Sequence, residues 1–158
     1  MNDNLSLPTL RRVRITFGKT GAMQYVGNLD MHTVWERTFR RARLPLAYTK
    51  GFNPRPRFQV AASLPVGASS RCELVDVWLE NPPGIEDILS TLAAAAPNGL
   101  LILAGEEVTL SEPALQTRLI SAEFMVTMRE PLVAGELVTR VNGLLAANQL
   151  TRVWRGKE

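Results

Sequence analysis

The fold is decided by residues 58–108, which read FQVAASLPVGASSRCELVDVWLENPPGIEDILSTLAAAAPNGLLILAGEEV. Apolar side chains fall on one face over 58–64, and 71–80 continues as a second apolar run, so the turn signal PVGASS between them predicts a strand hairpin. The apolar residues of 85–96 follow the spacing of an amphipathic helix, and 100–108 predicts another strand. The order is therefore strand, strand, helix, strand.

A strand and a helix precede this stretch. Within RRVRITF (11–17) Val13, Ile15 and Phe17 share one face, as in a half-buried strand. The helix is expected to begin near Asn28, with Asn28 as its N-cap, and to stop at residue 44 before a proline. Its inward stripe is predicted to contain Met31, Val34, Trp35, Thr38, Phe39 and Ala42. A long, proline-rich loop then runs to residue 57.

Together these elements predict an α+β fold, with a ferredoxin-like βαββαβ unit over residues 11–109. Farther along, the patterns predict a strand at 121–128, a helix carrying Leu137, Val141 and Leu145, and a strand at 149–155. This is the first half of a second copy of the unit. We interpret residues 119–158 as an incomplete second ferredoxin-like unit, truncated or completed by a partner.

Composition limits the classes of protein. The chain has 158 residues, 46% of them hydrophobic, enough for one core or for one domain plus part of another. No apolar run reaches the length of a membrane span, and the N-terminus lacks the order of a signal peptide. One cysteine cannot form an internal disulfide, so the simplest compartment is a reducing cytoplasm.

Positive charge is concentrated in the first third. Residues 11–57 hold eleven lysines and arginines against two carboxylates, although the whole chain has a net charge of only +3. In a βαββαβ unit the start of the first strand, the end of the first helix and the loop into the second strand meet at one end of the sheet. The rim predicted there consists of Arg11, Arg12, Arg40, Arg41, Arg43, Lys50, Arg55 and Arg57. Lys19 is expected at the opposite end.

Two interpretations of this rim remain open. Arginines in the last turn of a helix interact favourably with the helix dipole, and their stems cover apolar surface. A cluster of like charges, however, repels itself unless an anion relieves the repulsion, which favours an anionic partner and RNA above all. In the same loop Tyr48 and Phe52 either stack on a base or anchor their own segment.

Catalytic and cofactor motifs are sparse. FGKTG has Val13 where a phosphate-binding loop needs its first glycine. A single histidine and a single cysteine do not make a zinc site, and the cysteine motif of an iron–sulfur cluster is absent, so no metal or cofactor is predicted. His32 is either a solvent-facing helix residue or an acid–base group for RNA cleavage. Asp30, Glu73 and Asp76 are predicted structural carboxylates, with Asp76 paired to a rim arginine.

Residues 25–79 also resemble a known family, and the match extends over residues 11 to about 155. The chain is similar to the radical-SAM-linked proteins, whose pattern has Tyr-x-Ser-His-Leu-Asp, Leu-Pro-x-x-Tyr-Ser-x-Gly-Phe-Asn-Pro-x-Pro and Leu-Pro-x-Gly-x-x-Ser-x-x-Glu-x-x-Asp. The matching residues are Leu29, Asp30, Arg40, Arg41, Ala42, Leu44, Pro45, Tyr48, Gly51, Phe52, Asn53, Pro54, Pro56, Leu64, Pro65, Gly67, Ser70, Glu73 and Asp76. Gly27 and Asn28 replace Ser-His, and Thr49 replaces Ser.

The resemblance implies a domain of unknown function, found alone or fused behind a cobalamin-binding radical-SAM protein. Three functions follow as hypotheses. The first is a non-catalytic accessory domain that binds RNA through the rim and presents it to a radical-SAM partner, with Gly51, Phe52, Asn53 and Pro54 fixing the loop. The second is a protein-interaction subunit that docks on that partner. The third is an RNA-processing enzyme that uses His32.

Overall fold

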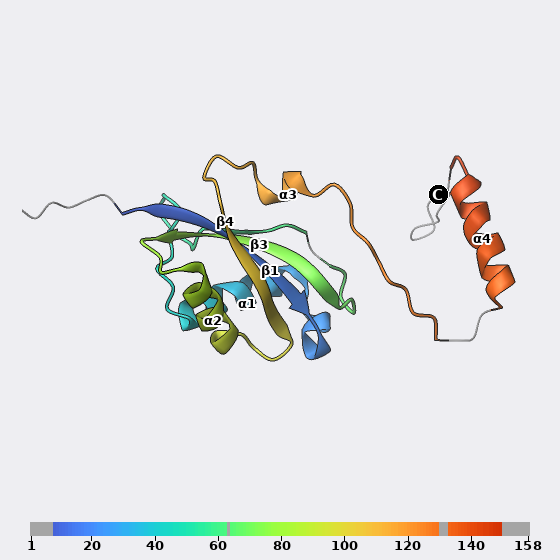
Figure 1. Cartoon of the computed structure of the whole chain (residues 1–158), viewed down its shortest axis with the longest axis horizontal. Helices are drawn as coiled ribbons and strands as arrows, with labels where there is room; N and C mark the ends of the chain where they lie inside the picture. Colours follow the sequence, from blue (N-terminus) through green and yellow to red (C-terminus); the bar gives the residue numbers. More distant parts are fainter. Residues whose placement is uncertain (1–7, 63, 130–132, 150–158) are drawn as a thin grey trace, which may run out of the picture. The chain divides into compact units, whose positions relative to one another are not determined.

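A computed structural model describes residues 8–62, 64–129 and 133–149. The protein is mixed α+β, with an antiparallel sheet in the order β2-β3-β1-β4 (Figure 1). The strands are β1 (Leu10–Lys19), β2 (Phe58–Val60), β3 (Ser70–Glu80) and β4 (Leu100–Val108). The helices are η1 (Gly21–Tyr25, a 3-10 helix), α1 (Asn28–Arg41), α2 (Ile85–Ala95), α3 (Leu115–Arg118) and α4 (Ala134–Ala146).

The core lies between one face of the sheet and the helices α1 and α2. Alternate residues of β1 and β3 point into it, and Val13, Ile15 and Phe17 are completely buried. The ring of Trp35 in α1 lies 4.9 Å from that of Phe17 and 5.0 Å from that of Phe39, measured between centroids. The predicted inward stripe of α1 is confirmed, since none of its residues is exposed.

The start of α1 differs from the prediction. Gly27 is the N-cap residue and makes no side-chain capping bond, whereas Asn28 is the first helical residue. The expectation that Asn28 caps the helix is therefore wrong. Its amide side chain is one residue too far along the chain to take the capping position, where a side chain accepts from the free N–H groups of the first turn.

β2 is shorter than the predicted strand at 58–64. It pairs with β3 over Phe58–Val60, and Ala61 N–H then donates to the carbonyl of Leu74 (2.9 Å). An edge strand is held by one neighbour, and Ala61 and Ala62 have little side chain to pack on the sheet. The hairpin pairing itself is confirmed, and η1 and α3 were not predicted.

The chain divides into two compact units, one ending at Ser121 and the other beginning at Ala122. The described residues 121–128 form no strand, contrary to the predicted one, whereas α4 confirms the predicted helix and has no buried residue. The strand expected at 149–155 falls almost wholly outside the described residues. Across the described ranges, no helix combines the length and apolarity that crossing a membrane requires.

Candidate functional site

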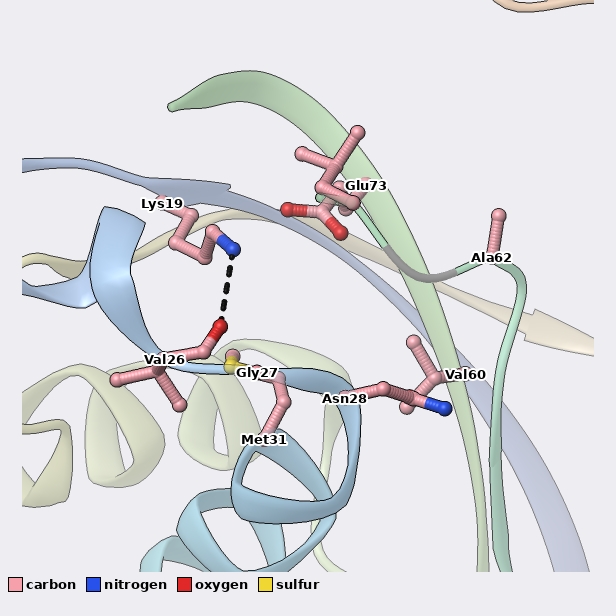
Figure 2. Close-up of a pocket in the computed structure, with 9 residues that line it drawn as sticks. Lys19, Val26, Gly27, Asn28, Met31, Val60, Ala62 and Glu73 are labelled. Atoms are coloured by element: carbon pink, nitrogen blue, oxygen red, sulfur yellow. Dashed lines mark hydrogen bonds between the residues drawn. The ribbon is translucent and has the colours of Figure 1, made fainter. Parts of the chain in front are cut away.

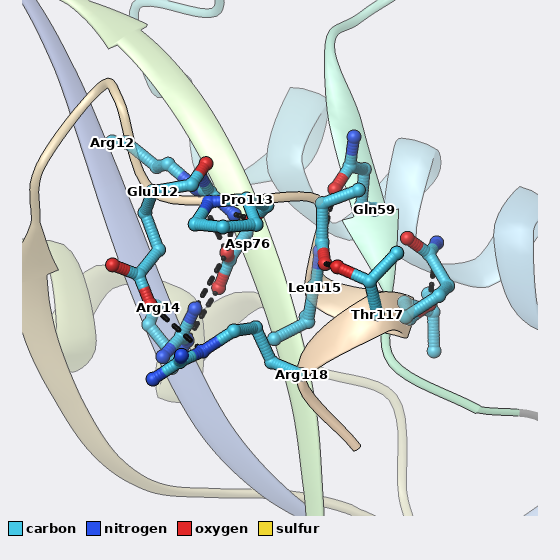
Figure 3. Close-up of polar contacts among 12 residues, drawn as sticks. Arg12, Arg14, Gln59, Asp76, Glu112, Pro113, Leu115, Thr117 and Arg118 are labelled. Atoms are coloured by element: carbon cyan, nitrogen blue, oxygen red, sulfur yellow. Dashed lines mark hydrogen bonds and ion pairs between the residues drawn. The ribbon is translucent and has the colours of Figure 1, made fainter.

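Arg12 does not lie on an open rim, because it is buried against Asp76. Its Nε and Nη2 donate to Asp76 Oδ2 at 2.8 and 2.6 Å, and only 1% of the side chain is exposed. Arg14 donates from Nε to the other carboxylate oxygen at 2.9 Å (Figure 3). The Asp76 hydrogen bond raises the pKa of Arg14 above its ordinary value. The buried carboxylate is thus shared by two guanidinium groups.

Residues 109–118, which follow β4 and which we call the covering segment, pack over these groups on the face of the sheet opposite α1 and α2. Arg12 also donates to the carbonyl oxygens of Glu112 and Pro113, and the N–H of Leu115 donates to Gln59 Oε1 at 3.1 Å (Figure 3). Leu115 itself is buried. This covering segment explains why Arg12 is removed from solvent although it lies on the outward face of β1.

Three other predicted rim residues have partners of their own. Arg11 Nε donates to Glu107 at 2.9 Å, and this hydrogen bond holds the pKa of Glu107 below its ordinary value. Arg40 pairs with Glu36 one helical turn earlier, at 2.9 Å. Arg41 donates to the carbonyl of Ala95, the last residue of α2, also at 2.9 Å. Four of the eight predicted cations therefore have a partner within the chain, although Arg40 and Arg41 remain exposed.

The remaining four predicted cations belong to one segment, residues 42–57, which we call the basic loop. They are Arg43, Lys50, Arg55 and Arg57, and all four are exposed. Within residues 8–62, 64–129 and 133–149, none of them forms an ion pair with a carboxylate. The loop therefore presents four positive charges to solvent without internal neutralisation.

Hydrogen bonds to β3 hold both ends of the basic loop. Ala47 N–H donates to the carbonyl of Trp78 (2.9 Å), and Trp78 N–H donates to the carbonyl of Arg57 (3.0 Å). Arg57 N–H in turn donates to the carbonyl of Ala47 (2.8 Å). The Arg57 guanidinium lies 4.3 Å from the centroid of the Trp78 ring, a cation–π contact. The contact holds the guanidinium group of Arg57 against Trp78 at the base of the loop.

Arg43 adopts a backbone conformation that is unusual for arginine. Its φ is +53°, and it follows Ala42, the C-cap residue of α1. Leu44 N–H donates to the carbonyl of Phe39, and Arg43 N–H to that of Arg40, the two bonds of a Schellman motif. Glycine usually occupies this left-handed position, and a residue with a Cβ costs about 1 kcal/mol more. A cation therefore occupies a position where the backbone conformation is strained for any residue with a Cβ.

We expect Arg43→Gly to raise the free energy of unfolding by about 0.5–1 kcal/mol, because glycine relieves the left-handed strain. The same variant is expected to bind RNA more weakly, since one loop cation is lost. Urea unfolding and RNA titration measure the two effects separately. Arg43→Ala, which removes the charge and keeps the strain, is the control; equal stability of the Gly and Ala variants would refute the strain argument.

The residues predicted to fix the loop lie at its tip. Gly51, Phe52, Asn53 and Pro54 are all exposed, and Tyr48 is about half exposed. Gly51 has a φ of +147°, which favours glycine. Neither aromatic side chain is buried as an anchor.

A small polar pocket lies at the Lys19 end of β1, beside the start of α1. Lys19 is almost completely buried, and its Nζ donates to the carbonyl of Val26 at 3.3 Å (Figure 2). Glu73 lines the same pocket and accepts a hydrogen bond from Ser70 Oγ. The hollow holds about 10 Å³, the space of roughly one water molecule. Its size excludes an organic ligand, and Lys19 lies apart from the basic loop, as expected.

Burial raises the pKa of Glu73 above its ordinary value of 4.5, outweighing the opposing effects of Ser70 and Lys19. A raised folded-state pKa adds stability below the unfolded-state pKa, and this stability is lost as the pH rises through the folded-state pKa. We expect the unfolding free energy of the wild type, relative to Glu73→Gln, to fall from pH 4 upward. Urea unfolding between pH 4 and 7 measures this difference; a constant difference would contradict the shift.

The other candidate groups show no catalytic arrangement. His32 is exposed on α1, with its ring 5.1 Å from that of Phe58, and Asp30 is exposed in the first helical turn. Among the described residues no three His, Cys, Asp or Glu side chains are grouped as metal ligands. Of the predicted site residues, the cations of the basic loop are therefore the exposed group that has no carboxylate partner among the described residues.

Comparison with known families gives a match that spans almost the whole chain. The model of a bacterial family described as an uncharacterized conserved protein, DUF2344, matches residues 12–158. A comparison with curated proteins found no match. The matched range includes α1, the basic loop and the whole sheet apart from the first two residues of β1. The chain therefore belongs to the uncharacterized bacterial protein family DUF2344.

Proposed function

We propose that this protein is a non-catalytic accessory domain that binds RNA through the basic loop and presents it to a radical-SAM protein. The radical-SAM partner enters through the sequence resemblance. The RNA part of the proposal rests on charge placement. The ferredoxin-like arrangement is part of the same proposal, and the strand order β2-β3-β1-β4 with antiparallel pairing supports it.

One observation carries the RNA proposal: among the described residues, three of the other four rim arginines pair with carboxylates, whereas the four cations of the basic loop pair with none. Arg12 pairs with Asp76, Arg11 with Glu107 and Arg40 with Glu36. The loop cations repel one another without such partners, and a polyanion relieves this repulsion. Phosphate groups spaced along a strand match several separate cations better than a single carboxylate does.

Titration of the full chain with a fluorescent RNA oligonucleotide at several salt concentrations tests the proposal. Four phosphate contacts predict that log K falls with log salt with a slope of about −3 for a single strand. The expected result is saturable binding that weakens steeply between 50 and 200 mM salt. Absence of binding at low salt, or binding that salt does not weaken, would refute the proposal.

The exposed apolar side chains of the second unit favour protein interaction as a second candidate function. The helix has no buried residue, and its apolar side chains Leu137, Val138 and Val141 are exposed. Met125, in the same unit, is also exposed. Apolar surface of this kind is typical of a protein-binding region. Charge reversal at Arg40 and Arg41 separates an electrostatic docking mode from an apolar one in a pull-down with the radical-SAM protein.

RNA processing through His32 is the lesser alternative. The residue is exposed on α1, and its ring contacts Phe58. A general acid or base needs a reacting group within hydrogen-bond reach and normally a second catalytic group. Cleavage of bound RNA by the wild type that is lost in His32→Ala would support this alternative, whereas retained cleavage would end it.

A further inference from the structure

We propose that the tip of the basic loop recognises single-stranded RNA, with Phe52 stacking on an unpaired base while Lys50 and Arg55 contact the flanking phosphates. This inference rests on the proposed RNA-binding function and names its substrate class. It assigns Phe52 a role that charge alone does not supply.

Phe52 is exposed to an extent that separates it from the other phenylalanines of the first unit. Its relative accessibility is 101%, whereas Phe17 and Phe39 are at 0%. Leaving a phenylalanine in water forgoes about 1.5–3 kcal/mol of burial free energy. Isolated exposed apolar residues are common, so the exposure of Phe52 indicates a binding role only together with the residues around it. Phe52 lies midway along a tip bounded by Lys50 and Arg55.

The tip rests on an ordered base. Tyr48 and Pro56 form a bridge between the two sides of the loop, and Thr49 N–H donates to the carbonyl of Arg55 at 2.9 Å. Arg55 N–H returns a bond to Thr49 Oγ1 at 3.1 Å. Five residues, 50–54, therefore project from a base that is hydrogen-bonded on both sides. Because these bonds already order the base, its residues need not be ordered when a ligand binds to the tip.

The exposed tip of the basic loop suits single-stranded RNA, which has unpaired bases, better than a duplex. In an A-form helix the base faces are stacked inside, and the exposed features are phosphates and 2′-hydroxyls. Single strands expose a π-face at every base, and proteins bind them by combining cationic side chains with aromatic platforms. Phe52 provides the platform, and Lys50 and Arg55 provide the charge on either side of it.

Asn53 argues for RNA over an anionic lipid surface. Its amide both donates and accepts hydrogen bonds, so it suits the polar edge of a base stacked on the neighbouring Phe52. Insertion of the same tip among lipid tails would place this exposed amide in an apolar medium without a partner. The apolar side chains at the tip, Phe52 and Pro54, are also a small area to anchor a protein on a membrane.

Fluorescence anisotropy with the full chain tests the inference, using a 10-nucleotide single-stranded RNA and the same sequence as a duplex. Phe52→Ala is expected to weaken single-strand binding about 5- to 150-fold, the range of base–aromatic stacking. Its salt slope should stay unchanged because no charge is removed. Phe52→Trp should restore the affinity. Val66→Ala, which also shortens an exposed apolar side chain, is the matched control.

The outcomes separate this inference from the proposed function. The stacking role would be overturned if Phe52→Ala left RNA binding intact while the double variant Lys50→Gln/Arg55→Gln weakened it. That result would retain the RNA proposal. Equal affinity for strand and duplex would overturn the single-strand preference. Binding to phosphatidylserine vesicles with no RNA binding would overturn both. Phe52 is fully exposed, so its variants are expected to retain the wild-type unfolding midpoint.

Discussion

Asp76→Ala is expected to lower the free energy of unfolding by about 3–5 kcal/mol. Asp76 is completely buried and is shared by Arg12, which is 1% exposed, and Arg14, which is 14% exposed. Removing the carboxylate leaves two positive charges at the same place with no anion, and Arg12 has no route to solvent without displacing the covering segment. A domain that is stable by about 5–15 kcal/mol loses a large part of its margin.

Urea unfolding followed by tryptophan fluorescence measures this loss. Asp76→Asn keeps the shape and some hydrogen bonding, so it is expected to be less destabilising and provides a folded variant if the alanine protein does not fold. Glu36→Ala removes the partner of Arg40 from an exposed pair and is expected to cost less than about 1 kcal/mol. Similar losses for Asp76→Ala and Glu36→Ala would contradict the account of a buried ionic network.

Replacement of all four basic-loop cations by glutamine is expected to weaken RNA binding about 100- to 1,000-fold at 100 mM salt. The variant changes Arg43, Lys50, Arg55 and Arg57. Each cation that neutralises a phosphate releases counterions, and this term dominates the affinity of proteins for nucleic acid. All four side chains are exposed, so the variant is expected to fold. The titration that tests the wild type measures the loss.

The secondary structure was largely predictable because residues that face the core recur with the period of the strand or helix that carries them. Val13, Ile15 and Phe17 alternate on β1, and Met31, Trp35 and Phe39 follow helical spacing on α1, so each residue type reports the face on which it lies. The strand predicted at 58–64 is longer than β2 because the end of an edge strand depends on the residues that it packs against. The sequence around Ala61 and Ala62 does not indicate where this packing stops. The covering segment at 109–118 has no strong period and was missed.

The candidate site was only partly predictable, because charge is visible in a sequence but its neutralisation is not. The pairing of Asp76 with a rim arginine was predicted from their positions in apolar strands, and Arg12 confirms it. The pairing of Arg11 with Glu107 depends on β4 lying beside β1, a long-range contact. Both arginines had been assigned to the rim. In the sequence, the one indication that Arg12 is buried and paired, unlike the loop cations, is the position of Asp76 in a strand expected beside β1.

The salt dependence of RNA binding tests the central claim most directly, with two variants that remove the same charge. One changes the four basic-loop cations to glutamine; the other changes Arg71, Arg118, Arg129 and Arg140, all exposed and outside the loop. The account predicts that the slope of log K against log salt falls from about −3 to near zero in the first variant and stays close to the wild type in the second. Equal slopes in the two variants would show that net charge, and not the basic loop, determines binding.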